Sequence, residues 1–418
     1  MFNKLISGIA IFTSAWILSF FLTTSAIAAT NAELEARIAA LEAKLAYLTV
    51  NTNTISDLKG PHVIFSGANV HIQNGAGENG DKTNGVGNFI VGYNANPADP
   101  RRGGSHNVVI GARHHYSSYG GLVAGESNTI GGVSASVTGG RNNIASGDWS
   151  SVSGGGDGNP IAGNIASGRY SSVSAGAQNT ASGTFSGVSG GAINKASGLL
   201  SNIGGGVANT ASGRQSFVIG GANNIASGNI SSVFGGSSNQ ATGVGASVSG
   251  GTNNSARAIG ATVSGGQHNS AVGRYSSVSG GAQNIAGDPS SPDTGLSQYT
   301  SVSGGLFNTA RAYASSVNSG TNNLANGIFS SVSGGSNNTA TGEYSSVGGG
   351  NTNVSTSINQ HMPSSPLAPY VTINPSAFNN LNGPNIVFTG ANIHVRSGGG
   401  TSGTEENGLG NFIVGANQ

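Results

Sequence analysis

The chain has 418 residues, of which 72 are glycine and none is cysteine, while only 7% are charged and 36% are hydrophobic. Glycine at this level without a strict triplet period excludes both an ordinary enzyme core and a collagen triple helix. The lack of cysteine excludes disulfides, cysteine-ligated zinc and thiol catalysis, and a formal net charge of +1 argues against a nucleic-acid partner.

Residues 1–28 have the order of a secretory signal peptide. Lys4 provides a basic start, an apolar stretch runs from Leu5 to Leu22, and Ala26-Ile27-Ala28 forms a cleavage site of small residues. The alternative is an uncleaved membrane anchor, which the cleavage site disfavours. We predict export to the extracellular space or the bacterial cell surface, and a mature chain without a transmembrane segment.

Residues 29–58 are predicted to form a short α-helical coiled coil, because this stretch is rich in Ala, Leu, Glu and Lys. Its apolar residues are spaced alternately four and three apart, as at the a and d positions of a heptad. This seam consists of Leu34, Ile38, Leu41, Leu45 and Leu48. It predicts an oligomer of two or three chains; the alternative is an amphipathic helix that packs on its own domain.

Residues 59–94 form a Gly-Pro unit whose alternating apolar residues predict β-strands. It leads into residues 95–353, where a unit of 15 residues recurs with the pattern S-S-V-S-G-G-x-x-N-x-A-S-G. We number positions from the central Val or Ile of each unit, which is position 0. The predicted repeat core consists of these residues: Val137, Val152, Val173, Val188, Ile203, Val218, Val233, Val248, Val263, Val278, Val302, Val317, Val332 and Val347.

Earlier units are expected at Val108 and Leu122, and Phe89 is a candidate for the first. Each period contains two short β-like pieces separated by glycine-rich corners, which predicts one flattened coil of a parallel β-roll or solenoid. Two units are longer, by six residues after Gly155 and by nine after Ala286. Both insertions are predicted to lie at corners, where coils tolerate them.

Alternation along the strands assigns side chains to faces: position 0 and the Ser at −2 share one face, and the Asn at +6 shares a face with the Ala at +8. Stacked coils would align the asparagines in a ladder of amide hydrogen bonds. We call these residues the Asn row: Asn179, Asn194, Asn209, Asn224, Asn239, Asn254, Asn269, Asn284, Asn308, Asn323 and Asn338.

Position −3 is apolar in nine units. Seven of these residues are aromatic, and the two aliphatic ones are Leu200 and Ile230. The aromatic members, here called the aromatic row, are Trp149, Tyr170, Phe185, Tyr275, Tyr299, Phe329 and Tyr344. Two interpretations are open: the row packs between neighbouring chains, or it binds glycans or a host protein. We favour packing between chains.

Residues 354–382 carry four prolines within Ser355–Asn382 and are predicted to be a linker. Residues 383–418 repeat the Gly-Pro unit, since Gly383–Asn417 aligns with Gly60–Asn94 without a gap. The second copy either begins a further roll in a longer chain, which we favour, or caps this one.

No catalytic, metal-binding or cofactor-binding residues are predicted, and the chain is not expected to be an enzyme. The acids and histidines are scattered, and a solenoid enzyme for polysaccharides would need clustered carboxylates. The adjacent His114 and His115 are expected in an exposed loop rather than at a metal. Asp157 follows three glycines as in calcium-binding β-roll loops, but no acid recurs in successive repeats.

The repeats contain the segment Val108-Val109-Ile110-Gly111 and, in later units, Gly at +3, a polar residue at +6, Ala at +8 and Gly at +10. With these features they resemble the YadA-like head repeats of trimeric autotransporter adhesins. The resemblance covers Phe89–Asn353 and implies a parallel, left-handed β-roll trimer that is displayed at a bacterial surface for adhesion. Here the period is mainly 15 rather than 14, and Asn replaces Ser at +6. No segment resembles that family's membrane anchor.

We therefore predict an all-β fold and a function as a secreted or cell-surface structural adhesin. Its expected partners are further copies of the chain, as a homotrimer, and a host protein, matrix or glycan ligand. One alternative is an ice-binding β-solenoid, suggested by the regular Ser rows on either side of position 0. A further alternative is a non-adhesive structural rod or a spacer like a phage fibre.

Overall fold

The structure is a computed structural model that describes residues 30–77, 82–95, 100–156, 163–290, 295–362, 371–374 and 385–388. The chain divides into two compact units, the first ending at Gln73 and the second beginning at Asn74. The predicted signal peptide, residues 1–28, lies outside the described residues.

The first unit contains a helix over residues 30–44 and an antiparallel hairpin of β1 (Leu48–Asn51) and β2 (His62–Phe65). Contrary to the prediction, the helical seam does not extend to Leu48, which begins β1 and pairs with Phe65. The β-branched residues Thr49 and Val50 favour a strand over a further helical turn. Four seam residues are exposed on this helix or directly after it: Leu34, Ile38, Leu41 and Leu45.

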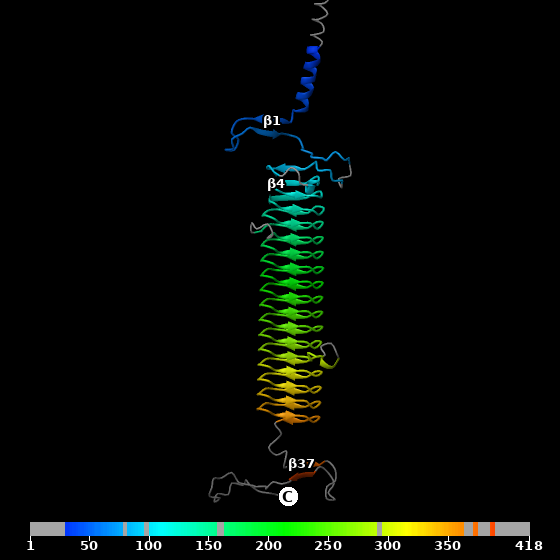
Figure 1. Ribbon diagram of the computed structural model, residues 1–418, viewed down its shortest axis with the longest axis vertical. Coiled ribbons are helices and arrows are strands. Elements are labelled where there is room, and N and C mark those ends of the chain that lie inside the picture. Colours follow the sequence, from blue (N-terminus) through cyan, green and yellow to red (C-terminus); the bar gives the residue numbers. More distant parts are fainter. Residues whose placement is uncertain are drawn as a thin grey trace, which may run out of the picture. The chain divides into compact units, whose positions relative to one another are not determined.

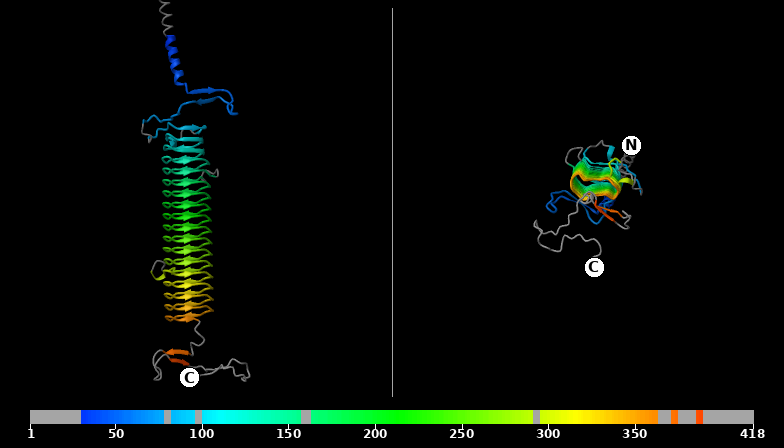
Figure 2. Two further views of the ribbon diagram at one scale, coloured as in Figure 1. Left: turned by 180° about the vertical axis from the view of Figure 1, so that it is seen from behind. Right: turned by 90° about the horizontal axis from the view of Figure 1, so that it is seen from below.

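The second unit contains a parallel β-solenoid of about 17 turns of about 15 residues, which confirms the predicted solenoid. Each turn contributes one strand to each of two sheets, and the sheets face each other across a narrow interior (Figures 1 and 2). Strands of successive turns pair in parallel, so Val233 lies beside Val248 and Ala226 beside Ala241.

The first sheet begins at β3 and then takes every even-numbered strand in order. Its strands are β3 (Phe89–Val91), β4 (Val108–Ala112), β6 (Leu122–Glu126), β8 (Ser136–Val137), β10 (Ser151–Val152), β12 (Ser172–Val173), β14 (Gly187–Val188), β16 (Asn202–Ile203), β18 (Phe217–Val218), β20 (Ser232–Val233), β22 (Ser247–Val248), β24 (Thr262–Val263), β26 (Ser277–Val278), β28 (Ser301–Val302), β30 (Ser316–Val317), β32 (Ser331–Val332), β34 (Ser346–Val347) and β36 (His361–Met362).

The second sheet has 16 strands, all odd-numbered. They are β5 (His115–Tyr116), β7 (Thr129–Ile130), β9 (Ile144–Ala145), β11 (Ile165–Ala166), β13 (Thr180–Ala181), β15 (Lys195–Ala196), β17 (Thr210–Ala211), β19 (Ile225–Ala226), β21 (Gln240–Ala241), β23 (Ser255–Ala256), β25 (Ser270–Ala271), β27 (Ile285–Ala286), β29 (Thr309–Ala310), β31 (Leu324–Ala325), β33 (Thr339–Ala340) and β35 (Val354–Ser355). Two 3-10 helices, η1 (Pro100–Arg102) and η2 (Gly295–Ser297), lie outside the sheets.

The interior is filled by four side chains per turn, at positions −2, 0, +6 and +8, as alternation predicted. In one turn these are Ser231, Val233, Asn239 and Ala241, all buried. All fourteen residues of the predicted repeat core are buried. From Val137 onward, the interior of a typical turn therefore holds one large apolar side chain beside an alanine and two small polar residues, whereas the first turns also bury Tyr116 and Ile130.

The first two full turns differ from the prediction by one residue. The inward residues are Val109 and Val123, whereas Val108 and Leu122 point outward, because Val123 pairs with Val137. These turns have 14 residues because they carry one corner glycine, Gly125, where later turns carry a pair such as Gly139-Gly140. Counting back 15 residues from Val137 therefore selects Leu122 instead of Val123, and the same offset of one residue carries over to Val108.

Both long insertions leave the sheets undisturbed, as predicted. Ile144 pairs with Ile165 across the first, and Val278 pairs with Val302 across the second. The solenoid continues beyond the boundary predicted at residue 353, because β35 and β36 complete one more turn that ends at Met362.

The hairpin of the first unit has a counterpart near the C-terminal end. β37 (Val371–Asn374) and β38 (Asn385–Phe388) pair antiparallel, with Val371 opposite Phe388 as Leu48 is opposite Phe65. The duplicated unit therefore begins about a dozen residues earlier than the alignment of Gly383 with Gly60 indicates, and takes in part of the predicted linker.

Candidate functional site

The Asn row links every turn to the next. In a representative turn, the side-chain oxygen of Asn239 accepts the backbone N–H of Asn254 at 3.0 Å. Its Nδ2 donates to the carbonyl of Gly235 at 2.9 Å and to that of Gly251, one turn further, at 2.9 Å. All eleven predicted members are buried, and the structure extends the row to five others: Asn94, Asn128, Asn143, Asn164 and Asn353.

These bonds differ from the amide-to-amide ladder that the sequence led us to expect. The side-chain oxygen binds the backbone of the next asparagine, because Nδ2 is already occupied by two corner carbonyls. Those carbonyls belong to the glycine pair of the corner, in which the second glycine, such as Gly236 or Gly251, has a positive φ. A direct amide contact is added only between Asn194 and Asn179, at 3.1 Å, among the eleven predicted members.

Position −2 contributes a second interior row, in which most hydroxyls lack partners; the exception is Ser330, which accepts the N–H of Gly327 at 3.1 Å. Alanine occupies the same position at Ala135, Ala246 and Ala261. The buried hydroxyls for which no hydrogen bond is found among the described residues are those of Ser150, Ser171, Ser186, Ser201, Ser216, Ser231, Ser276, Thr300, Ser315 and Ser345. This row fills space and does not tie the turns together.

The aromatic row lies at the corner that leads into the first sheet. Every member has a positive φ, from 53° at Trp149 to 58° at Tyr170 and Tyr299. Each backbone N–H donates to the preceding turn, as in the 2.9 Å bond from Tyr170 to the carbonyl of Asp148. Bulky side chains rarely adopt this conformation, which costs roughly 1–2 kcal/mol per residue. The sequence therefore places aromatic rings at a corner where Gly or Asn would be less strained.

The rings of the aromatic row stack on one another along the solenoid. Centroids are 5.0 Å apart for Trp149 and Tyr170, and 4.7 Å for Tyr170 and Phe185, with planes within 11°. Two further stacked pairs are Tyr275 with Tyr299 and Phe329 with Tyr344. Tyr313, at position −4, bridges these pairs through edge contacts that the sequence analysis missed.

The stacks determine which part of each ring is free. Exposed fractions run from 39% at Tyr170 to 54% at Tyr275. Parallel stacking covers both faces of Tyr170 and one face of each of the other rings, so the row presents mainly ring edges to solvent, together with the faces at the ends of the stacks. Sugars bind aromatic residues chiefly through the negative ring face, whereas apolar surfaces pack against edges equally well.

The aromatic row is interrupted in the middle of the solenoid. Position −3 is occupied by Gly245 and Gly260 in two successive turns, and the ring of Tyr275 lies over Gly260, within 2.6 Å of where a Cβ atom would be. The two apolar non-aromatic members, Leu200 and Ile230, are also exposed and also have positive φ. The row thus consists of two aromatic segments with an open corner between them.

His114 is fully buried, contrary to the expectation of an exposed loop, and it occupies a place in the Asn row. Its Nδ1 accepts the N–H of Asn128 at 3.3 Å, and its Nε2 lies 3.0 Å from the carbonyl of Ile110. A neutral ring protonated at Nε2 thus reproduces the acceptor and donor of an asparagine. Burial lowers the pKa of His114, with a smaller contribution from the charge of His115.

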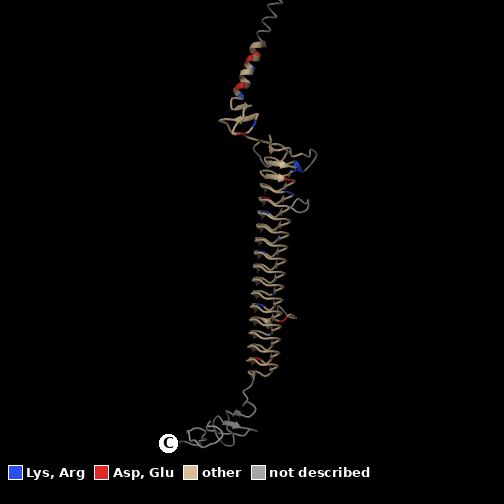
Figure 3. Ribbon diagram, turned by 90° about the vertical axis from the view of Figure 1, so that its left-hand side faces the viewer, with Lys and Arg blue, Asp and Glu red and all other residues tan. Residues whose placement is uncertain are grey.

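Charged residues are sparse along the described coils (Figure 3). Glu126 pairs with Arg113 and Arg141, and Asp288 lies 3.7 Å from Arg311. Over the residues that the structure describes, no three His, Asp or Glu side chains come together as metal ligands. Asp157 lies outside the described residues.

Comparisons with protein-family models and with curated proteins found no match to this chain. Within the described ranges, no helix is long and apolar enough to cross a membrane.

Proposed function

We propose that the protein is an exported structural adhesin: an oligomeric solenoid rod that acts by surface contact, with the aromatic row as the seam between chains. The proposed assembly is a homotrimer, following the family resemblance. The rod presents its outer surfaces for adhesion to a host protein, matrix or glycan, and no reaction is assigned to it.

One observation carries this proposal. Seven aromatic side chains occupy a strained backbone conformation and remain about half exposed in the single chain. Strain of this kind persists where another interaction compensates for it. Burial of the free edges against the same row of another chain would supply that compensation, since an aromatic side chain contributes a large apolar surface.

The first unit supports association independently. Leu34, Ile38 and Leu41 are exposed on the helix and keep heptad spacing, as expected where partner helices meet. A helix of about four turns is marginally stable alone in water, so a partner would stabilise it.

The test replaces Tyr275, Tyr299, Phe329 and Tyr344 with Ser in the full chain. Multi-angle light scattering should show a smaller particle, and the melting temperature should fall, because each aromatic residue removed from a buried site costs about 3–5 kcal/mol. A matched control replaces Phe217 and Phe234, an aromatic pair on the outer face of the first sheet, and should keep the oligomer intact.

A different result would favour the alternative that the aromatic row binds a glycan or a host protein. If the fourfold variant kept its mass and melting temperature but lost adhesion to immobilised glycans or matrix proteins, the seam would be refuted. Unchanged mass and unchanged adhesion together would refute both interpretations of the row.

Ice binding is a second candidate, favoured by the outer face of the first sheet. From β22 to β32 the positions on either side of the buried Val carry hydroxyls in register, apart from Asn318. These residues are Ser247, Ser249, Thr262, Ser264, Ser277, Ser279, Ser301, Ser303, Ser316, Ser331 and Ser333. Thermal hysteresis of the purified protein would support this candidate, and its absence would exclude it.

A further inference from the structure

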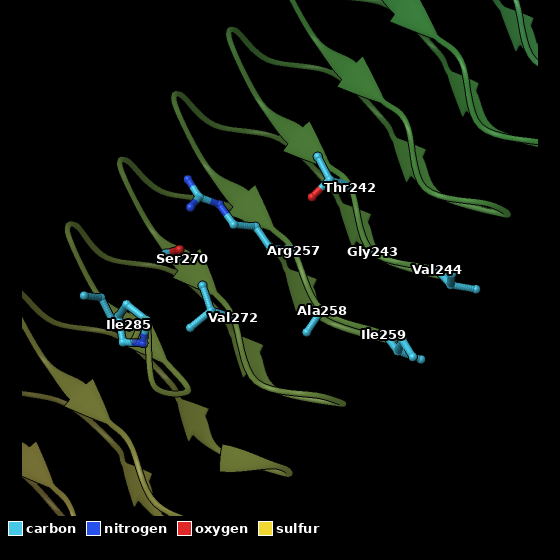
Figure 4. Close-up of a pocket in the computed structure, with 10 residues that line it drawn as sticks. Thr242, Gly243, Val244, Arg257, Ala258, Ile259, Ser270, Val272 and Ile285 are labelled. Atoms are coloured by element: carbon cyan, nitrogen blue, oxygen red, sulfur yellow. The ribbon is translucent and has the colours of Figure 1, made fainter. Parts of the chain in front are cut away.

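A pocket of about 550 Å³ lies on the outer side of the second sheet, beside the second insertion. Residues from successive turns form it: Figure 4 shows Thr242, Arg257 and Val272 on neighbouring coils, with Val244 and Ile259 at the adjoining corner. Pro289, from the insertion, contributes to its wall. The volume lies within the range of about 300–1,000 Å³ that is typical of small-molecule sites.

The residues of this pocket depart from the repeat. Position +9 is Ser in six consecutive turns, from Ser146 to Ser227, and then becomes Thr242, Arg257 and Val272. Position +10, usually Gly, is Ala258. At position +9, the hydroxyls of the six earlier turns thus give way to one cation and one apolar side chain beside the insertion.

The insertion is held in place independently of the pocket. Asp288 accepts hydrogen bonds from the hydroxyl of Ser290 at 2.7 Å and from its N–H at 3.0 Å, and it faces Arg311 at 3.7 Å. Ser297 is buried, and its backbone lies against Gly273. A Cβ atom added to Gly273 would lie 2.0 Å from the carbonyl oxygen of Ser297. The wall formed by Pro289 is therefore built into the fold.

Among the described residues that line the pocket, Arg257 is the only charged one. Its Nε donates to the hydroxyl of Ser255 at 2.9 Å, which orients the guanidinium over the sheet. No described residue pairs with its two terminal amino groups, and the nearest described carboxylate of the insertion, that of Asp288, is already bound. A guanidinium with two free donors matches the two oxygens of a carboxylate.

We propose that this pocket binds an organic carboxylate with an apolar body, an aryl or alkyl acid, whose carboxylate pairs with Arg257 while its body packs on Val272, Ile259 and Val244. The described lining offers two hydroxyls, those of Thr242 and Ser270, so a hydroxyl-rich sugar acid would leave polar groups without partners. The site adjoins the open corner of the aromatic row, because Val244 and Ile259 directly precede Gly245 and Gly260 at position −3, but its binding test does not depend on the seam between chains.

The test measures binding of phenylacetate to the full-length protein by titration calorimetry, with phenylacetamide and glucuronate as comparison probes. Phenylacetate should bind at least tenfold more tightly than either. Arg257→Ser and Val272→Ser restore the residue of the six earlier turns, so both variants should fold, and each should weaken binding of phenylacetate, the first at least tenfold.

Arg214→Ser is the matched control, because it removes an exposed arginine from a turn outside the pocket and should leave binding unchanged. Equal binding of phenylacetate and phenylacetamide would overturn the role of Arg257. Stronger binding of glucuronate would overturn the apolar ligand class, and no binding of phenylacetate at millimolar concentration would overturn the site.

Discussion

Each coil turns at two corners, and the corners combine similar backbone conformations with different side chains. At the first, left-handed residues such as Gly236 (φ 83°) and Ser238 (φ 58°) precede the buried Asn239. At the second, a left-handed residue such as Ile230 (φ 58°) precedes the buried Ser231. The amide of the first corner is fully bonded inside, whereas the hydroxyl of the second has no partner and the bulky side chain lies outside. The first corner therefore specifies the coil, and the second is free to specify contacts with other molecules.

Asn239→Ala should have the largest effect on the folding of a single chain. The variant leaves the N–H of Asn254 and the carbonyls of Gly235 and Gly251 without their partner. We expect the free energy of unfolding to fall by about 3 kcal/mol or more. Chemical denaturation measures it, with Asn253→Gly, an exposed change in the corresponding corner of the next turn, as a control that should stay within about 0.5 kcal/mol. Equal losses for the two variants would contradict the role given to the first corner.

Phe329→Gly tests whether the ring at the second corner is buried between chains. In an isolated chain, glycine would relieve the strain of the positive φ, a gain of about 1 kcal/mol, but it would also remove the ring contacts of Phe329 with Tyr344 and Tyr313, so we expect little net change. At a seam between chains, the loss of a buried ring exceeds this gain, and we expect a net loss of about 2 kcal/mol per chain. Gln215→Gly, at the same position of another turn, should not lower stability. Unchanged or higher stability for Phe329→Gly in thermal melting would speak against the seam.

His114 makes the first corner sensitive to acid where it stands in place of an asparagine. Because its pKa in the folded protein lies below the usual 6.5, unfolding takes up a proton between these two values. Its contribution to stability is therefore complete above about pH 6.5 and is lost as the pH falls toward the folded pKa. We expect His114→Asn to lose less stability than the unmodified protein between pH 7.5 and 5. An identical pH profile in chemical denaturation would exclude this role.

Ser231→Ala should have the smallest effect. The hydroxyl is buried without a partner, and Ala246 and Ala261 show that alanine fits the same position. We expect a change in unfolding free energy within about 0.5 kcal/mol, or a slight stabilisation. A loss approaching that of Asn239→Ala would mean that the second corner also holds the coil.

The repeat of Val, Asn and Ala was sufficient to predict the coil, its inward residues and the placement of both insertions at corners, because each depends only on alternation along short strands. The register of the first turns depended on one missing corner glycine, so the spacing chose Val108 instead of Val109. The heptad spacing extended the predicted helix to Leu48. The prediction was wrong there because Leu48 pairs with the strand His62–Phe65, and the spacing carries no information about that strand.

The candidate sites were less predictable. The aromatic row was visible as a recurring position, but its positive φ and stacked rings come from the corner geometry. The bonds of the Asn row depend on where corner carbonyls point, which no spacing encodes. The pocket at Arg257 combines three departures from the repeat with an insertion, and only the fold brings them together.

Disulfide cross-linking can detect whether the aromatic rows of neighbouring chains lie together, because the chain contains no cysteine of its own. Ala314 lies at position −3 between Tyr299 and Phe329, and Ser264 lies on the outer face of the first sheet. If the rows of neighbouring chains pack together, Ala314→Cys should form disulfide-linked dimers under mild oxidation, and Ser264→Cys should not. A monomeric band for Ala314→Cys, at a concentration where light scattering shows an oligomer, would contradict the seam.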